Sequence, residues 1–553
     1  MKNKLALITL VLSATLSLTG CDFIMQFFDS EYQGGFFPIG GESAQVPPRI
    51  SDVPTPPPGD TNANKASYIY GDLIDNSIYP LSCTPSIGTA KLLVIPVWFT
   101  NSSTYITESK RDSVRQDIES AYFGDETTTG WRSVKSYYEE ESLGSLTIDG
   151  KVSEWYECGQ SVSYYAKDPA TEQSGAPKTS ELVKKATDWY FTNHSSESRT
   201  DYDQDGDGYL DGVILIYAAP DYDTLKNDSY DNLWAFCFWI QDTSVQRPLN
   251  PGVNVFFWAS YDFIYGTDNA LTRTGSRYHA GDTTHCILDA HTYIHEMGHM
   301  FGLEDYYDYS SYKYQPAGAF SMQDHNIGGH DPFSSFALGW GKAYVPIETT
   351  TIDLKPFSTS GEMIILSPSW NTYNSPFDEY IIVEYYTPQG LNTLDSTYKY
   401  MATSGKDYPI GPVEYGIRVW HVDARLLYTT TGEWSANKIT TNPKHSPGRV
   451  AIMMSNTYAG GGADSYISVL GAGYANYNLL QMIRNNISTT YKPAKNDFFN
   501  SNSLFKANDT FSMSRYASQF VNGKKLNNNS ELGFSFTVNA CNNNYASISI
   551  TKL

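Results

Sequence analysis

The 553-residue sequence predicts an α+β fold, in which a domain of mixed strands and helices is followed by a β-rich domain. Up to about residue 345, runs typical of buried strands alternate with apolar residues at helical spacing, which indicates a mixed sheet packed against helices. After residue 345 the apolar runs are short and are separated by Gly, Pro and Asn, which favours a β-sandwich-like domain. We therefore expect one domain at residues 67–345 and a second at residues 346–553.

The individual elements follow from apolar periodicity. A helix is expected at residues 114–122, whose apolar positions share one face before Gly124, and a second helix at residues 182–190. Pro96 lies inside the first expected strand, at residues 92–99. Proline has no N–H to donate to a neighbouring strand, so we expect a sheet edge or a bulge there. Strands are expected at residues 92–99, 146–148, 155–156, 213–217, 363–366, 380–383 and 417–420.

The N-terminus predicts export. Lys2 and Lys4 precede an uncharged apolar run at residues 5–18, which is shorter than the roughly 20 residues that span a bilayer and is typical of a signal peptide. The run ends in Leu-Thr-Gly-Cys, which resembles the lipobox of bacterial lipoproteins. Residues 1–21 are therefore predicted to be a lipoprotein signal peptide, with Cys21 as the acylated residue. An ordinary secretory signal is the alternative.

Residues 22–66 are rich in proline and glycine, and consecutive prolines favour an extended chain. We expect a semi-rigid tether there, with a short propeptide as the alternative. The expected location is the bacterial cell envelope, where the protein would be lipid-anchored at the outer face of a membrane or the cell surface.

The charge balance excludes one class of partner. The chain has 38 Lys and Arg against 60 Asp and Glu, which gives a formal net charge of −22. Nucleic-acid binding needs clustered basic side chains, so no nucleic-acid partner is expected. The six cysteines are far fewer than a fold held together by disulfides would have.

The segment at residues 295–299 reads His-Glu-Met-Gly-His. On a helix, His295 and His299 lie on one face about 6 Å apart along the axis, so both imidazoles can bind one Zn²⁺. Glu296 then lies beside the metal and can take a proton from water that the metal activates. The spacing predicts a catalytic zinc site with Glu296 as the general base.

A catalytic zinc needs a third protein ligand. His291 lies on the same helical stripe but about 12 Å from the second motif histidine along the axis, which is too far to share the ion. Gly302 can end the helix in a left-handed conformation and return the chain toward the metal. Asp305 follows the motif by six residues, where metzincin-type enzymes place their third ligand. Glu304 and Asp308 are the alternatives.

Met322 closes an Ala-Phe-Ser-Met segment that resembles the metzincin Met-turn, whose methionine forms an apolar floor under the zinc. An ordinary buried methionine is the alternative. In several metzincins a Tyr two residues later helps to stabilise the oxyanion, but this chain has Asp324 there. Candidates for that role are Tyr306, Tyr307, His325 and His330.

An acidic loop before the strand at residues 213–217 suggests a second metal. Its first, third, fifth and ninth positions are Asp203, Asp205, Asp207 and Asp211. This spacing resembles the start of a calcium loop, although Ile214 stands where an EF-hand has its bidentate Glu. Because four like charges in nine residues repel one another, we predict structural Ca²⁺ there, with a solvated acidic turn as the alternative.

Residues 295–308, HEMGHMFGLEDYYD, resemble the signature of the immune inhibitor A family of secreted bacterial metallopeptidases. That signature is His-Glu-aromatic-Gly-His followed by Leu-Gly-Leu-Pro-Asp and an aromatic-Asp pair; Met297, Phe301 and Glu304 depart from it without removing a ligand or the base. Residues 133–146, 339–340 and 416–423 resemble further family segments. The resemblance implies a metzincin-like zinc peptidase domain.

These observations predict a zinc-dependent endopeptidase that hydrolyses proteins or peptides at the bacterial cell surface, with Glu296 as base and His295, His299 and Asp305 as zinc ligands. Two alternatives stay open. One is a non-catalytic surface adhesin or binding lipoprotein with a protease-like fold, and the other is a zinc amidase acting on cell-wall or glycan substrates.

Overall fold

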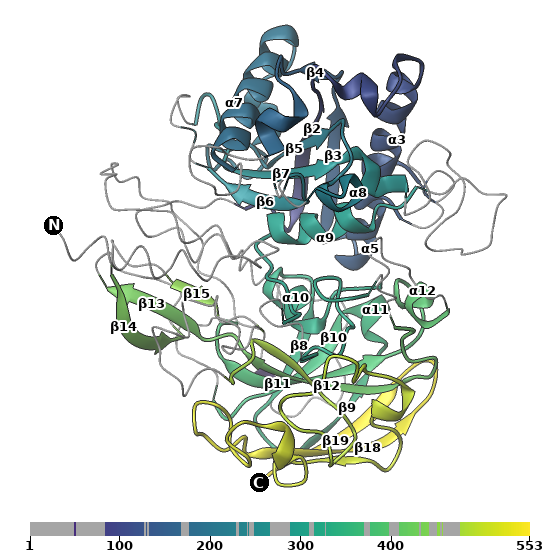
Figure 1. Cartoon of the computed structure of the whole chain (residues 1–553). Helices are drawn as coiled ribbons and strands as arrows, with labels where there is room; N and C mark the ends of the chain where they lie inside the picture. The colour runs from purple at the N-terminus through teal and green to yellow at the C-terminus, as the bar shows by residue number, and fades with distance from the viewer. Residues whose placement is uncertain are drawn as a thin grey trace.

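A helix-containing body in the N-terminal half and a strand-rich body in the C-terminal half make up the computed structural model shown in Figure 1. The structure describes Arg49, Ile50 and residues 83–553 except for 126–128, 130–131, 167–175, 228–229, 231, 241, 243–247, 266–287, 309–313, 327, 370–375, 398–408, 431–432, 442–450, 454–455 and 457–475. The predicted signal peptide with Cys21, and the predicted tether apart from Arg49 and Ile50, lie outside the described residues. Among the described helices, none combines the length and the apolar character that crossing a bilayer requires.

A mixed sheet forms the centre of the N-terminal body. Its order is β3-β2-β5-β7-β6, with all neighbours parallel except the edge strand β6, and β4 pairs with β2 beyond the end of β3. The apolar runs of β2 and β5 are buried on both faces, as parallel strands covered by helices are. The bounds are β2 (Gly88–Trp98), β3 (Leu146–Val152), β4 (Tyr156–Glu157), β5 (Gly212–Tyr217), β6 (Phe236–Trp239) and β7 (Val255–Ser260).

Alternate residues of β2 pack into different helical layers. Leu93 and Ile95 share a core with α6 and α7, whereas Leu92 and Val94 share a core with α3, α5 and α9. The predicted helices at residues 114–122 and 182–190 are confirmed as α3 and α7. The helix bounds in this body are α3 (Arg111–Phe123), α5 (Val134–Glu141), α6 (Val162–Ala166), α7 (Ala176–Asn193), α8 (Tyr222–Leu225) and α9 (His291–Met300).

The expectation that Pro96 marks a sheet edge or a bulge is wrong. Strand β2 lies between β3 and β5, and Pro96 pairs in regular register with Ile216. The β3 side explains why a proline fits. Val94 O and Trp98 O accept hydrogen bonds from that side, so the missing N–H of Pro96 points there as well. Strand β3 ends at Val152 and β4 begins only at Tyr156, so the interrupted neighbour supplies no ladder partner at that point.

Two sheets build most of the C-terminal body. The six-stranded sheet has the order β1-β8-β10-β11-β12-β16, and the four-stranded sheet has the order β17-β18-β19-β9. The bounds in the first are β1 (Arg49–Ile50), β8 (Lys342–Pro346), β10 (Glu362–Leu366), β11 (Glu379–Tyr386), β12 (Gly416–Asp423) and β16 (Leu480–Ile483). Those in the second are β9 (Thr350–Leu354), β17 (Thr510–Phe511), β18 (Phe534–Cys541) and β19 (Ala546–Lys552).

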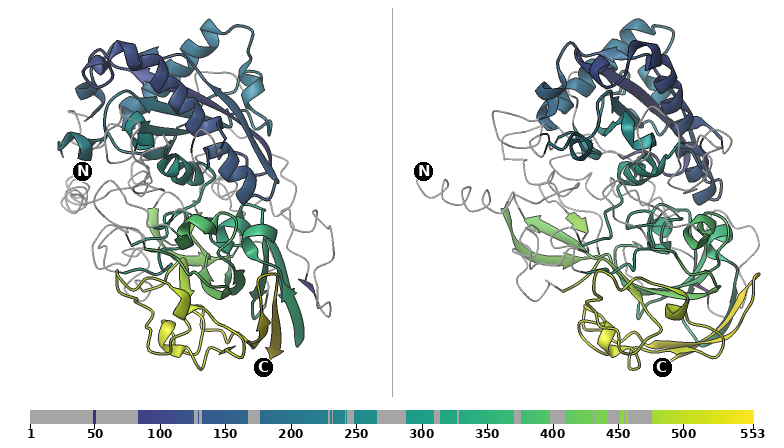
Figure 2. Two further views of the ribbon diagram at one scale, coloured as in Figure 1. Left: turned by 90° about the vertical axis from the view of Figure 1, so that its right-hand side faces the viewer. Right: turned by 45° about the vertical axis from the view of Figure 1, so that its right-hand side comes forward.

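The smaller elements of this body complete the described fold. A third sheet pairs β14 (Glu433–Thr440), β13 (Leu426–Thr430) and β15 (Ala451–Met453). The helices are α10 (Pro332–Ala337), α11 (Phe357–Ser360) and α12 (Asn392–Thr397). The helix-containing body and the strand-rich body are also separate in both views of Figure 2.

The two faces of the six-stranded sheet have different neighbours. One face shares a core with the four-stranded sheet. The opposite face packs on α10 and on Tyr306 and Phe320, which belong to the loops after α9. Met322 lies in the same chain segment as Phe320 but is buried in the core of the N-terminal body. The segment after α9 therefore lies between the two bodies, where Figure 1 also places α9.

Candidate metal centre

Helix α9 carries the His-Glu-Met-Gly-His segment and ends in a defined cap. Gly302 has a φ of +93° and donates its N–H to His299 O at 2.8 Å, and Leu303 N donates to Gly298 O at 3.1 Å. This pair of bonds is a Schellman motif, which needs a left-handed residue that glycine adopts without strain. The cap reverses the chain, so that Asp305 returns alongside the helix.

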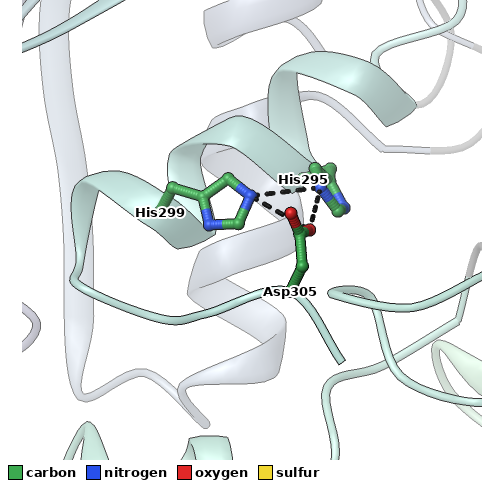
Figure 3. A group of neighbouring side chains, drawn as sticks. All are labelled: His295, His299 and Asp305. Carbon is green, nitrogen blue, oxygen red and sulfur yellow. Dashed lines mark hydrogen bonds and ion pairs between the residues drawn. The ribbon is translucent and has the colours of Figure 1, made fainter. Parts of the chain in front are cut away.

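The three predicted zinc ligands converge on one point. Figure 3 shows the imidazoles of His295 and His299 and the carboxylate of Asp305 directed toward one another. Asp305 Oδ1 lies 3.1 Å from His295 Nε2 and 3.3 Å from His299 Nε2, and the two Nε2 atoms are 3.2 Å apart. Asp305 and His299 are buried, and His295 is partly exposed. The site therefore opens to solvent on the side of His295.

Hydrogen bonds at the other ring nitrogens fix the tautomers. His295 Nδ1 lies 2.8 Å from Met322 O, and His299 Nδ1 lies 2.7 Å from Leu303 O. A carbonyl oxygen only accepts, so each Nδ1 carries the proton and each Nε2 presents a lone pair. Asp305 Oδ1 also lacks a hydrogen-bond donor among the described residues. Three electron-pair donors thus face one another with no proton between them.

This arrangement fits a tetrahedral metal ion. Ligand bonds of about 2.0–2.1 Å at tetrahedral angles separate the ligand atoms by about 3.3–3.4 Å, close to the separations of 3.1–3.3 Å found here. Burial raises the pKa of Asp305, but His299 and His295 in their protonated form lower it well below its usual range, so the carboxyl group gives up its proton before the two imidazoles do. Two neutral imidazoles and one carboxylate form a donor set typical of catalytic zinc, which leaves a fourth position open.

Glu296 lies beside these ligands and is almost fully buried. Its Oε2 has no hydrogen-bond partner among the described residues, and burial raises the pKa of this carboxyl group. A buried carboxylate without a donor is costly unless a bound group or a proton satisfies it. Glu296 is therefore placed to exchange a proton with a molecule in the open position of the site.

Comparison with known proteins finds similarity to one family of peptidases. Residues 87–247 match the family described as immune inhibitor A peptidase M6, catalytic domain. The pre-pro-metalloprotease PrtV of Vibrio cholerae serotype O1 is 27% identical over 192 residues, which are 32% of this chain and 19% of that protein. Immune inhibitor A of Bacillus thuringiensis subsp. alesti is 27% identical over 195 residues, which are 32% of this chain and 25% of that protein. Residues 87–247 are thus similar to the catalytic domain of immune inhibitor A peptidases.

The match to the family ends at residue 247, before α9 begins. The matched residues include β2 to β6 but neither β7 nor α9, so the roles of individual residues on α9 rest on their geometry. The matched regions span a quarter or less of the length of these two relatives.

The other ligand candidates are placed differently. His291 Nε2 lies 2.8 Å from Asn326 O, one helical turn before His295. Among the described residues, the histidine and carboxylate group that can hold one ion contains Asp305 but neither Glu304 nor Asp308.

The other residues that the sequence singled out lie in the segment after α9, and most of them are buried. Met322 is fully buried, and its carbonyl holds His295. The Asp324 carboxylate accepts from Gln315 Nε2 and Ala319 N and contacts His325 Nδ1, so it fixes the turn. Four candidates remain for the oxyanion role. The Tyr306 hydroxyl contacts Ser334 Oγ, and burial lowers the pKa of His330 to about 3. The ring of Tyr307 packs on the ring of His325, which is partly exposed.

In the acidic loop before β5, three of the four predicted calcium ligands lie close together. Asp203, Asp205 and Asp211 have carboxylate oxygens within 4.8 Å of one another. Asp207 lies outside that group, and its Oδ1 accepts from the N–H of Tyr209. Burial raises the pKa of Asp211 to about 7, although backbone N–H donors from residues 91 and 204 lower it in part.

Sequence reasoning missed Gln323, whose side chain lies against His299. The only local signal was Gly298, because a glycine inside a helix often marks the close approach of another group.

Proposed function

We propose that this chain is a zinc-dependent endopeptidase that hydrolyses proteins or peptides. The observation that carries the proposal is the convergence of His295 Nε2, His299 Nε2 and Asp305 Oδ1 beside the unpaired Oε2 of Glu296. Similarity to the immune inhibitor A peptidases supports peptide bonds as the substrate. An adhesin would have no need of the Glu296 carboxylate, which is costly to bury.

The mechanism assigns one role to each residue. His295, His299 and Asp305 would hold the ion, which when bound would supply a Lewis acid that polarises the scissile carbonyl and makes water more acidic. Glu296 accepts a proton from the attacking water at Oε2 and passes it to the departing amine nitrogen. Burial of Glu296 favours this cycle, because a raised pKa makes the carboxylate a stronger base.

The finer architecture belongs to the same proposal. We assign the N-terminal body to a metzincin-like catalytic domain, in which the antiparallel edge strand β6 lies next to α9, and the strand-rich C-terminal body to a β-sandwich-like domain. The boundary expected at residues 345 and 346 falls inside β8, which pairs with β10, so α10 and β8 belong with the second domain. The hydrogen bond from Cys237 Sγ in β6 to Glu296 O, at 3.0 Å, supports the first assignment. The core shared by two sheets supports the second.

Calcium and a lipid anchor complete the proposal. Asp203, Asp205 and Asp211, with Asp207 nearby, would bind structural Ca²⁺ that fixes the loop before β5. Acylation at Cys21 would hold the enzyme at the outer face of the bacterial cell envelope.

Casein or gelatin hydrolysis by the purified chain tests the proposal. We expect hydrolysis that a zinc chelator abolishes and that one equivalent of Zn²⁺ restores. A chain that binds zinc but cleaves only cell-wall amides would instead be the amidase. A chain that binds zinc but cleaves neither substrate class would be a binding protein.

A further inference from the structure

Gly298 occupies an unusual place in the active-site helix. It is the fourth residue of the five-residue zinc motif, inside α9, where glycine costs about 1 kcal/mol relative to alanine. A Cβ built on Gly298 would lie 2.2 Å from Gln323 Oε1 and 2.7 Å from Gln323 Cδ. The side chain of Gln323 therefore fills the space that a residue larger than glycine would need.

Gln323 is held in that space from several sides. Its side chain is fully buried, and its Nε2 lies 3.4 Å from both Nδ1 and Nε2 of His299. Equal distances to the two nitrogens, together with the Nδ1 bond to Leu303 O, indicate that the amide rests against the imidazole without taking a ring lone pair. The amide thus limits the rotation of His299 and leaves its Nε2 directed at the other ligands.

The backbone of Met322 and Gln323 contacts His295 and the residue after Asp305. Met322 O accepts from His295 Nδ1 at 2.8 Å, and Gln323 O accepts from the N–H of Tyr306, the residue after Asp305, at 2.8 Å. Two consecutive residues therefore contact two of the ligand residues and the residue that follows the third. The segment at residues 322 and 323 therefore helps to position the proposed ligands relative to one another.

The amide of Gln323 is retained at a cost. Its Oε1 is buried and has no hydrogen-bond partner among the described residues. An unpaired buried acceptor destabilises a protein by about 1–3 kcal/mol. An apolar side chain of similar length would avoid this cost, so packing alone does not account for glutamine at this position.

We propose that Gln323 is a positioning residue for the zinc site, which uses the space left by Gly298 to hold the His299 imidazole in its metal-binding orientation. This inference rests on the proposed zinc site. Groups that orient zinc ligands from outside the coordination shell typically change metal affinity by 10–100-fold when they are removed. Gln323 should show an effect of that size without touching the metal or the substrate.

Gln323→Met tests the positioning role, because it keeps the length and removes the amide. We expect the zinc dissociation constant, measured by competition with a chromogenic chelator, to rise at least tenfold. The melting temperature of the metal-free protein should not fall, because the unpaired Oε1 is lost. The absorption bands of the Co²⁺-substituted variant should also shift, because His299 is less well oriented.

Gln519→Met is the matched control. Gln519 is equally buried in the C-terminal body, but its amide is paired with the backbone of Arg484 and Asn486. This variant should lower the melting temperature and leave zinc affinity unchanged. Gln323→Met with wild-type zinc affinity and an unchanged Co²⁺ spectrum would overturn the positioning role while the zinc site stands. A wild-type chain without zinc affinity would instead overturn the zinc site itself.

A double-mutant cycle tests the steric pairing. Gly298→Ala alone should displace the Gln323 amide and weaken zinc binding by a factor similar to that of Gln323→Ala. Both changes disturb the same contact. In the Gln323→Ala background, Gly298→Ala should therefore raise the zinc dissociation constant by less than a further threefold. Independent, multiplying effects of the two substitutions would show that Gly298 and Gln323 do not act as a pair.

Discussion

Replacing the proposed base separates metal binding from catalysis. Glu296→Gln keeps the shape of a side chain that is only 6% exposed, so the three ligands should stay in place. The new amide N–H₂ would be buried with a cost of about 1–3 kcal/mol. Loss of a buried carboxylate offsets that cost, because burial already disfavours the ionised form of Glu296. The variant should therefore fold and bind zinc as the parent does.

Catalysis should respond very differently. A general base contributes about 10²–10⁴-fold to the rate, which corresponds to about 3–5 kcal/mol of transition-state stabilisation. We expect kcat on a fluorogenic peptide to fall by that factor, with one zinc per chain retained by elemental analysis. Glu304→Gln, on the loop beside Asp305, is the matched control and should keep both properties. Activity within tenfold of the parent, in a variant that holds its zinc, would refute the role of Glu296.

Four further predictions concern the third ligand, the helix cap, the acidic loop and the N-terminal cysteine. Asp305→Asn should weaken zinc binding by more than about 100-fold, because loss of a ligand should exceed the usual effect of losing a group outside the coordination shell. Competition with a chromogenic chelator will measure the zinc affinity. Gly302→Ala should destabilise the chain by about 1–3 kcal/mol in urea unfolding, because alanine is strained at a φ of +93°. The pKa of Asp211 is raised by burial to about 7, so in calcium-free protein the stability linked to its protonation is present at acidic pH and is lost as the pH rises through 7. Added Ca²⁺ should therefore raise the melting temperature more at pH 8 than at pH 5.5, and an equal effect at both values would contradict the site. Cys21→Ser should move the protein from the membrane fraction of its host to the soluble fraction, as immunoblotting would show.

Local sequence patterns predicted the elements whose structure depends on near neighbours. The apolar stripe ending at Gly124 predicted α3, and the β-type runs predicted β5, β10, β11 and β12. Tertiary context overrode the local pattern at Pro96, because the break between β3 and β4 removes the partner that a central strand would otherwise require. The predicted strand at residues 155–156 is found one residue later in the chain, as β4.

The part of the candidate metal centre that one helix and its cap encode could be predicted from the amino-acid sequence. His295 and His299 are four residues apart, and Gly302 ends the helix, so helical geometry alone brings two imidazoles together and returns Asp305 to them. Only the tertiary structure decided how these groups are held. Met322 O fixes the tautomer of His295, and Gln323 occupies the space above Gly298, across separations of 27 and 25 residues. The physical reason is that helical spacing is set by local backbone geometry, whereas contacts between distant segments depend on how the two bodies pack around α9.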